Sequence, residues 1–196
     1  DGTLDHRTTV EVGDGAVHHS ADFGYAGTGA IGGMLWLDLD GDGLRAADEP
    51  GIPQQAVGLL WWGPDAVSGT ADDQVYATVS DEAGSYRFGG LAAGTFEVTV
   101  QGPIVSAAGN VADEDGDRDS HTAVSLAVDE SHLSSDFGYR GSVEIGDLVW
   151  LDLNGDGLFG SLETGLGDVA LGVVWLGADA APGGGDDVVL PELRTD

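Results

Sequence analysis

The sequence contains no cysteine and no lysine, and all six of its basic residues are arginine. Without cysteine, neither a disulfide framework nor a thiolate metal site is available, so an extracellular form of this chain needs another source of stability. No apolar run approaches the length of a membrane span, and the first residues lack the basic-then-apolar pattern of a signal peptide. We therefore expect no membrane insertion in this segment, and we expect it to be a fragment of a longer chain.

Acidic residues dominate the charge, with 35 Asp and Glu and a formal net charge of −29. Nucleic acid and anionic membranes would be repelled, whereas divalent cations would be attracted. Most of the acid is Asp, placed beside Gly and Asn in short clusters. This pattern favours cation-binding loops over diffuse solvating charge, although the general surface acidity of a halophile's protein is an alternative.

An internal repeat of 114 residues sets the domain organisation. The segment Asp22-Phe23-Gly24-Tyr25 recurs at 136–139, and Trp36-Leu37-Asp38 recurs at 150–152. We infer one complete unit at 29–140. It is preceded by the C-terminal strands of another unit at 1–28 and followed by the N-terminal part of the next unit at 141–196.

The complete unit has the periodicity of β-strands, with alternating apolar residues separated by Gly, Pro, Asp and Asn. Seven short strands in a unit of this length are typical of an immunoglobulin-like sandwich. The fold class is therefore all-β, with tandem seven-stranded sandwiches. The expected strands are 31–37, 57–62, 74–80, 85–88, 95–100, 122–128 and 134–139.

Two loops match the calcium-loop pattern D-x-[DN]-x-[DN]-G-x₅-E in full. In this pattern oxygens at positions 1, 3 and 5 converge on one point, the Gly at 6 allows a sharp turn, a carbonyl at 7 joins them, and the Glu at 12 closes the far side. Pro50 and Pro53 follow the first loop, so we expect it to join two strands rather than two helices. The predicted ligands are Asp38, Asp40, Asp42, Leu44 and Glu49, and then Asp152, Asn154, Asp156, Leu158 and Glu163.

Further acidic clusters are weaker candidates for calcium. One is the loop with Asp113, Asp115, Asp117 and Asp119, where unpaired carboxylates would repel one another without a cation. A second combines Asp65 with Asp72 and Asp73, repeated as Asp179 with Asp186 and Asp187, where a plain solvated turn is an equal alternative. Asp81, in a turn, is a possible additional ligand.

Catalysis and aromatic recognition have less support. The histidines show no metal-ligand spacing, and neither a serine nucleophile elbow nor a phosphate-binding glycine loop occurs, so we predict that the protein is not an enzyme. Trp36 alternates with Met34 on a strand and is assigned to the core. Trp61 and Trp62 are adjacent on a strand and must face opposite ways. One of them is expected to meet solvent, a neighbouring domain or a sugar.

These motifs together resemble the SdrD B-like calcium-binding repeats of serine-aspartate-repeat surface proteins, within the wider collagen-adhesin B-type (Cna-B) group. The resemblance implies a Cna-B-like sandwich, several calcium ions per repeat, and a role in a stalk or adhesive rod. Many relatives carry an internal crosslink that needs lysine, which this chain lacks. The residues that carry the resemblance are Ile145–Asp147, Trp150–Gly157, Glu163, Gly69–Asp73, Asp81, Gly84–Phe88 and Asp136–Tyr139.

The sequence thus predicts a calcium-stabilised structural repeat of an extracellular or cell-surface prokaryotic protein, forming a stiff stalk, adhesin rod or filament. The alternative is a calcium-dependent recognition module that binds a glycan or a host or matrix protein. Expected partners are neighbouring repeats and identical chains in a filament. The loops at 38–50, 81–84 and 101–119 should share one end of the sandwich, with loop 177–187 of the next unit close to them.

Overall fold

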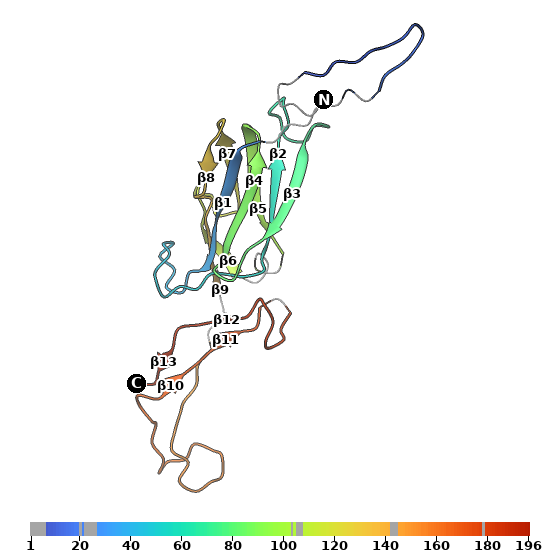
Figure 1. The fold of residues 1–196 in the computed structure, drawn as a ribbon. Coiled ribbons are helices and arrows are strands. Elements are labelled where there is room, and N and C mark those ends of the chain that lie inside the picture. Colours follow the sequence, from blue (N-terminus) through green and yellow to red (C-terminus); the bar gives the residue numbers. More distant parts are fainter. Residues whose placement is uncertain are drawn as a thin grey trace.

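A computed structural model describes residues 7–19, 21, 27–102, 104, 108–141, 145–177 and 179–196. Its centre is a β-sandwich spanning residues 29–141, and two short β-ribbons lie beyond the end of the sandwich where β9 finishes (Figure 1). The first copy of the Asp22–Tyr25 motif lies outside the described residues, and the C-terminal strands of a preceding unit expected at 1–28 fall only partly within them. Residues 7–19 and 21 contain no strand. Among the described residues, no helix is long and apolar enough to cross a membrane.

The first sheet has the order β4-β1-β9-β6, with the short strand β8 also paired to β1. β1 runs antiparallel to β4 but parallel to β8 and β9, and β6 is antiparallel to β9. The first and last strands of the sandwich, β1 and β9, are therefore neighbours in one sheet. The bounds are β1 Gly29–Leu37, β4 Ser85–Leu91, β6 Ala108–Ala112, β8 Ser131–His132 and β9 Phe137–Gly141.

The second sheet has the order β3-β2-β5-β7 and is antiparallel throughout. Its inward-facing residues alternate with exposed ones, as in β7, where Thr122, Val124 and Leu126 are buried and their neighbours are exposed. This alternation is what places one face of the sheet on the core. The bounds are β2 Ala56–Trp61, β3 Gln74–Val79, β5 Gly94–Gln101 and β7 His121–Leu126.

The core lies between the two sheets and contains residues from both. Ile31 and Leu35 of β1 and Phe137 of β9 meet Phe96 and Val98 of β5, and all five are at most 1% exposed. Burial of side chains of this size contributes about 1.5–3 kcal/mol each relative to exposure. All seven expected strands are present, so the all-β prediction is confirmed.

Two strands were missed, so the sandwich has nine strands where seven were expected. β6, with the sequence Ala-Gly-Asn-Val-Ala, lies inside the expected loop 101–119 and lacks the apolar alternation that marks a strand. It forms because the otherwise unpaired edge of β9 supplies backbone hydrogen-bond partners. The pairing is irregular, since its register shifts between Asn110 and Ala112. The expected strand 134–139 begins only at Phe137, because the Asp136 side chain, rather than a backbone carbonyl, accepts the Met34 N–H at 2.8 Å.

Trp36 is buried, with 5% exposure, but it does not belong to the core cluster between the sheets. Side chains alternate along β1, so Trp36 shares the outer face with Met34 while Leu35 points inward. The indole lies over Gly138 of β9, where an added Cβ would come within 2.6 Å of Trp36 Cζ2. The expected burial of Trp36 is therefore confirmed, but the ring lies on the outer face of the first sheet rather than in the cluster between the two sheets.

Residues 145–196 repeat local features of the sandwich. β11 Val174–Trp175 pairs with β12 Val188–Val189, and β10 Ala170–Leu171 pairs with β13 Leu193–Arg194. The β11–β12 register is that of the equivalent residues in β2 and β3, which lie 114 positions earlier. The isolated bridge Trp36–Gly51 likewise recurs as Trp150–Gly165.

Three of the expected neighbours share the end of the sandwich at which β9 finishes, which we call the exit end. Asp38 N donates to Tyr139 O, and Leu35 N donates to Gly84 O, so loop 38–50 and the 81–84 turn meet there. Val100 N donates to Ser120 O, which brings the end of the acidic loop 113–119 to the same region. The shared position follows from the parallel pairing of β1 with β9, because both strands end at this edge.

The contact of Trp36 with Gly138 gives a first prediction. Gly138→Ala would bring Cβ within 2.6 Å of a buried ring, so the ring or the strand must shift, and such overpacking costs about 1–3 kcal/mol of unfolding free energy. Gly89→Ala, on β4 and with no atom within 4 Å of the added Cβ, is the matched control. Urea unfolding of both variants checks this. Equal stability of the two would show that the Trp36–Gly138 packing contributes nothing.

Candidate metal centres

Loop 38–49 is organised around the buried carboxylate of Asp38, which is 1% exposed. Its two oxygens accept N–H groups from Gly41 at 2.5 Å and Gly43 at 2.8 Å. Gly41 and Gly43 have φ values of 82° and 77°, a conformation that glycine adopts without strain. The glycines therefore wrap the backbone around the carboxylate, which would be costly to bury without such partners.

The other acids of this loop are held in the same way. Asp42 N donates to Asp40 Oδ1 at 3.0 Å, and Leu44 N donates to Asp42 Oδ1 at 2.7 Å. Glu49, 4% exposed, closes the loop by accepting N–H groups from Leu39 at 2.7 Å and Ala46 at 2.9 Å. Each carboxylate oxygen has more than one lone pair, so these bonds leave acceptor capacity for a cation.

Loop 152–163 repeats this arrangement residue for residue. Asp152 accepts from Gly155 at 2.6 Å and from Gly157 at 2.9 Å, and Glu163 accepts from Leu153 at 3.0 Å and Gly160 at 2.7 Å. Asp156 N donates to Asn154 Oδ1 at 2.9 Å, and Leu158 N to Asp156 Oδ1 at 2.8 Å. The hydrogen bond from Gly157 is the main reason why the pKa of Asp152 is lowered. These hydrogen bonds therefore favour the charged form of the Asp152 carboxylate.

The first loop fits a calcium ion by its donor set and its dimensions. Carboxylate oxygens of Asp38, Asp40 and Asp42 lie within 4.8 Å of one another. Two oxygens on opposite sides of a calcium ion, each at about 2.4 Å, would be separated by a similar distance. All side-chain donors are hard oxygen ligands, which calcium prefers over softer metals. The second loop has the amide oxygen of Asn154 where the first has a carboxylate, and so carries one negative charge fewer.

The acidic loop 113–119 forms a second group. Carboxylate oxygens of Asp113, Asp115 and Asp119 lie within 4.8 Å of one another, whereas Asp117 is not part of that group. Asp113 accepts N–H groups from Gly116 and Asp119, both at 3.0 Å. Three of the four predicted ligands of this loop are therefore brought together.

The candidate formed by Asp65, Asp72 and Asp73 is gathered around the hydroxyl of Thr70. Thr70 Oγ1 lies 2.7 Å from Asp72 Oδ1, 3.3 Å from Asp73 Oδ1 and 3.5 Å from Asp65 Oδ1. The bond from Thr70 is the main cause of the lowered pKa of Asp72. The hydroxyl therefore satisfies this cluster at least in part, which agrees with the solvated-turn alternative.

The equivalent cluster at 179–187 lacks that hydroxyl, because Gly184 stands in the position of Thr70. The backbone bonds remain, with Gly183 N donating to Asp187 Oδ2 at 2.7 Å, as Gly69 N does to Asp73. The other oxygen of Asp187, Oδ1, is buried and has no hydrogen-bond partner among the described residues. An acceptor in this position could be satisfied by a cation.

Asp81 stabilises the turn in which it lies. Its Oδ1 accepts N–H groups from Ala83 at 2.9 Å and Ser85 at 2.8 Å, and these bonds close the connection between β3 and β4. The described groups of three or more acidic ligands do not include it. Its predicted role as an additional ligand stays a prediction.

Glu114 is a structural residue that the sequence reasoning missed. Its carboxylate lies 2.8 Å from His132 Nε2 and accepts hydroxyls from Ser134 at 3.3 Å and Ser135 at 3.2 Å. These contacts fasten the loop 113–119 to the strand region 131–136. The signal was present in the sequence, because Glu114 falls out of phase with the alternate aspartates and so points to a different neighbour.

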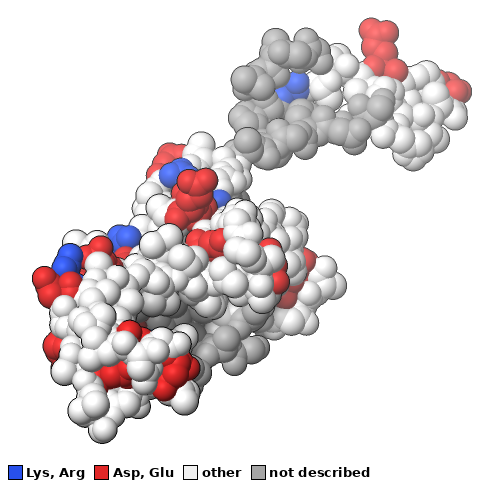
Figure 2. All heavy atoms as spheres, turned by 90° about the horizontal axis from the view of Figure 1, so that it is seen from below, with Lys and Arg blue, Asp and Glu red and all other residues white. Residues whose placement is uncertain are grey.

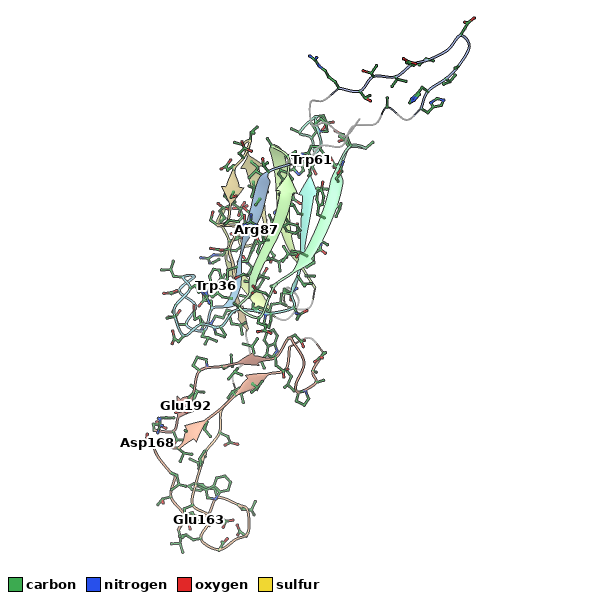
Figure 3. The ribbon with its side chains drawn as sticks, in the orientation of Figure 1. Trp36, Trp61, Arg87, Glu163, Asp168 and Glu192 are labelled. Atoms are coloured by element: carbon green, nitrogen blue, oxygen red, sulfur yellow. The ribbon has the colours of Figure 1, made fainter. Side chains whose placement is uncertain are left out.

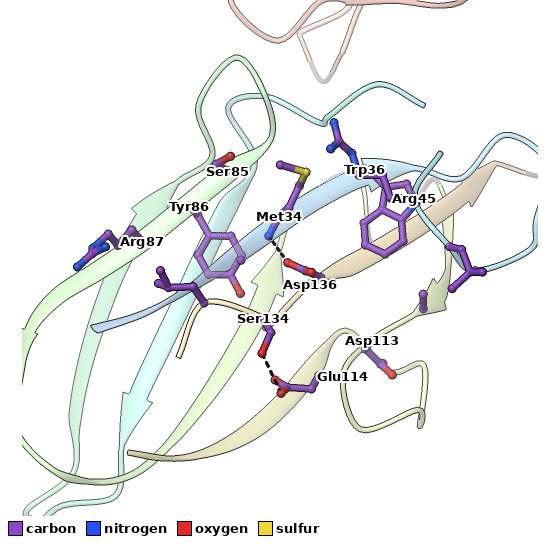
Figure 4. A pocket seen from close by; sticks show the side chains of 15 residues that line it. Met34, Trp36, Arg45, Ser85, Tyr86, Arg87, Asp113, Glu114, Ser134 and Asp136 are labelled. Atoms are coloured by element: carbon purple, nitrogen blue, oxygen red, sulfur yellow. Dashed lines mark hydrogen bonds between the residues drawn. The ribbon is translucent and has the colours of Figure 1, made fainter. Parts of the chain in front are cut away.

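A groove of about 710 Å³ opens on the outer face of the first sheet (Figure 4). Met34 and Trp36 of β1 line it together with Arg45, Arg87 and Asp136. Burial raises the pKa of Asp136 against the opposing effect of the Met34 N–H bond. Arg45 and Arg87 are two of the six basic residues, and elsewhere acidic side chains are spread over the visible face (Figure 2).

Comparison with known proteins identifies the family. The SdrD B-like domain matches residues 29–139, and the chain belongs to this family. It is 32% identical over 151 residues to serine-aspartate repeat-containing protein D of Staphylococcus aureus strain MW2, covering 74% of this chain and 10% of that protein. It is 29% identical over 145 residues to serine-aspartate repeat-containing protein E of strain MSSA476, covering 72% of this chain and 12% of that protein. The chain thus spans about a tenth of the length of these relatives.

Solved structures show a weaker likeness. The minor pilin GBS52 of Streptococcus agalactiae aligns at a TM-score of 0.38 with 12% identity, covering 62% of this chain and 48% of that one. The major plantain pollen allergen Pla l 1 aligns at 0.42 with 10% identity, covering 60% and 96%. The family assignment rests on the sequence match to residues 29–139.

The raised pKa of Asp136 gives a prediction about pH. The folded state holds a proton on this carboxyl more tightly than the unfolded chain does, so its contribution to stability is greatest at low pH and is lost as the pH rises through the raised value. Asp136→Asn keeps an oxygen for the Met34 N–H and removes the charge. The variant should therefore be more stable than the parent at pH 7, with a gain that shrinks towards pH values near 4.

Urea unfolding at both pH values, with chelator present throughout, measures this difference. Asp14→Asn, which removes an exposed carboxyl, is the control and should show no such pH-dependent gain. A loss of stability in Asp136→Asn at pH 7 would mean that the hydrogen bond from Met34, rather than burial, dominates the energetics of this carboxyl.

Proposed function

We propose that this chain is a calcium-stabilised structural repeat of an extracellular prokaryotic surface protein, and that such repeats in series form a stalk, rod or filament. The observation that carries the proposal is the pair of loops 38–49 and 152–163. Each loop matches the calcium-loop pattern in full, and in each the same six backbone N–H groups donate to side chains of that pattern.

The position of the first loop supports a stabilising role. It begins directly after β1, with Asp38 N bonded to Tyr139 O of β9, and it ends at Glu49 beside the bridge between Trp36 and Gly51. A cation bound by Asp38, Asp40, Asp42, Glu49 and the Leu44 carbonyl would therefore hold this loop in a fixed shape at the point where β1 ends beside β9. Because the loop joins strands rather than mobile helices, binding would stiffen the fold instead of switching it.

Family membership supports the structural role and the surface location. The curated relatives are serine-aspartate repeat-containing proteins of Staphylococcus aureus, of which this chain matches about a tenth. A segment that forms a small part of a long protein, and that itself contains a 114-residue repeat, suits a spacer. A glycan or protein ligand stays a prediction, and the groove around Met34, Arg45 and Arg87 is the place to look for one.

The energetic consequence of calcium would be large for a domain of this size. Extracellular calcium modules bind with dissociation constants of about 10⁻⁴–10⁻³ M. Calcium at about 100 times the dissociation constant adds roughly 2.7 kcal/mol per site. Two or three sites would therefore approach the whole stability of a typical domain, about 5–15 kcal/mol.

We predict that calcium raises the melting temperature and that excess EGTA reverses the rise. Asp42→Asn and Asp48→Asn form a matched pair, because each removes one exposed negative charge from the same loop and only Asp42 belongs to the ligand pattern. Asp42→Asn should lose part of the calcium-dependent rise, whereas Asp48→Asn should keep it. Thermal unfolding followed by circular dichroism measures both.

Two outcomes would count against the proposal. The first is a melting temperature of the parent chain that does not change between calcium and excess EGTA. The second is an equal loss of the calcium response in Asp42→Asn and Asp48→Asn, which would point to general charge screening, as in the halophile alternative, rather than to a bound ion.

A further inference from the structure

The ribbon β11–β12 of the second unit lies next to the exit end of the sandwich (Figure 1). Trp175 packs against the buried core cluster of the sandwich, whose members all fall between Ile31 and Tyr139. At Gly185, an added Cβ would lie 3.7 Å from Cγ of Gln54, so the loop after β11 also approaches the sandwich. The two units are thus in contact through side chains as well as joined by the chain.

Trp175 and Val188 form one apolar patch on this ribbon. They are directly opposite each other in the β11–β12 ladder, so their side chains lie on the same face. Val188 is only 4% exposed, whereas its neighbour Val189, on the other face, is 71% exposed. A two-stranded ribbon has no interior of its own in which to bury a side chain. Val188 is not a member of the core cluster of the sandwich, so it backs Trp175, which makes the contact with that cluster.

At the opposite end of the sandwich, which we call the entry end, the position that corresponds to Val188 holds a polar residue. Gln74 stands 114 residues before Val188, pairs with Trp61 as Val188 pairs with Trp175, and is exposed. Trp61 itself stacks on Phe96 of its own sandwich, with ring centroids 6.5 Å apart. Position 74 is thus polar and exposed where position 188 is apolar and buried.

We propose that Trp175 and Val188 form an apolar docking surface for the exit end of the preceding repeat of the same chain, and that this contact fixes the angle between the two units. The surface on the sandwich is the part of its core cluster that Trp175 contacts, with Gln54 beside the following loop. This inference deepens the proposed stalk function and rests on it for its biological purpose, but the contact itself needs no calcium. Only three residues separate Gly141 from Ile145, so the tether keeps the two surfaces close together.

The absence of cysteine allows the angle to be measured directly. Val128→Cys in the sandwich and Ala170→Cys in the second unit place two spin labels at exposed positions, and no native thiol competes. Pulsed electron–electron double resonance on the full 196-residue chain then gives the distribution of distances between the two spin labels. We expect a single narrow distribution in the otherwise unchanged chain.

Val188→Gln, which copies the residue found at position 74, should remove the narrow distribution and leave a broad one. Val189→Gln introduces the same side chain on the exposed face of the same strand and should leave the distribution narrow. Trp175→Ala should act like Val188→Gln. The melting temperature of the sandwich is compared among the three variants, to distinguish loss of the junction from loss of folding. If Trp175→Ala unfolds the second unit, Val188→Gln provides the milder change.

Distributions in Val188→Gln and Trp175→Ala as narrow as in the parent would overturn the proposal, since Trp175 would then serve its own repeat as Trp61 does. Equal broadening in Val189→Gln would also overturn it. The measurement is made in calcium and in EGTA. If the distribution of the parent chain is narrow in both calcium and EGTA, the apolar junction is supported even if the calcium proposal fails. If EGTA broadens the distribution of the parent chain and Val188→Gln adds no further broadening, then calcium, and not this patch, holds the two units together.

Discussion

Strands β1 and β9 lie in parallel, with Leu35, Trp36 and Leu37 opposite Phe137, Gly138 and Tyr139. This pairing joins the first strand of the sandwich to the last and makes both end at the same edge. Loop 38–49 must therefore begin beside the point at which the chain leaves for the next unit. The glycine at 138 allows the Trp36 ring to cover the seam, and the Asp136 side chain accepts the Met34 N–H where the two backbones separate.

The acidic loops are built on this frame. Asp38 is buried at the end of β1, and its charge is tolerated because the backbone of Gly41 and Gly43 folds around it. Glu49 returns the loop to the sheet. In Figure 3, Trp36 lies just before the first loop at the exit end of the sandwich, and Glu163 lies in the second loop, far along the second unit. The spacing between these loops would place successive bound ions at regular intervals along a multi-repeat chain.

Much of this could be read from the sequence because it depends on local spacing. The loop pattern determines which oxygens converge, because Asp40 and Asp42 form Asx turns and the partners of Asp38 are only three and five residues away. The strands of the second sheet are clear from alternation. β6 was missed because Ala-Gly-Asn-Val-Ala has no preference of its own and is held by β9. The face of Trp36, the anchor Glu114 and the burial of Val188 depend on residues distant in sequence, which a local pattern does not encode.

We propose that loops 38–49 and 152–163 bind calcium, and crystallography with anomalous scattering tests this most directly. Crystals grown in calcium should show an anomalous peak in each loop, with carboxylate, amide and carbonyl oxygens at about 2.3–2.6 Å from it. Asp38 and Asp152 should both be among the ligands. Well-ordered loops with the same backbone hydrogen bonds but no anomalous peak at either centre would contradict the account.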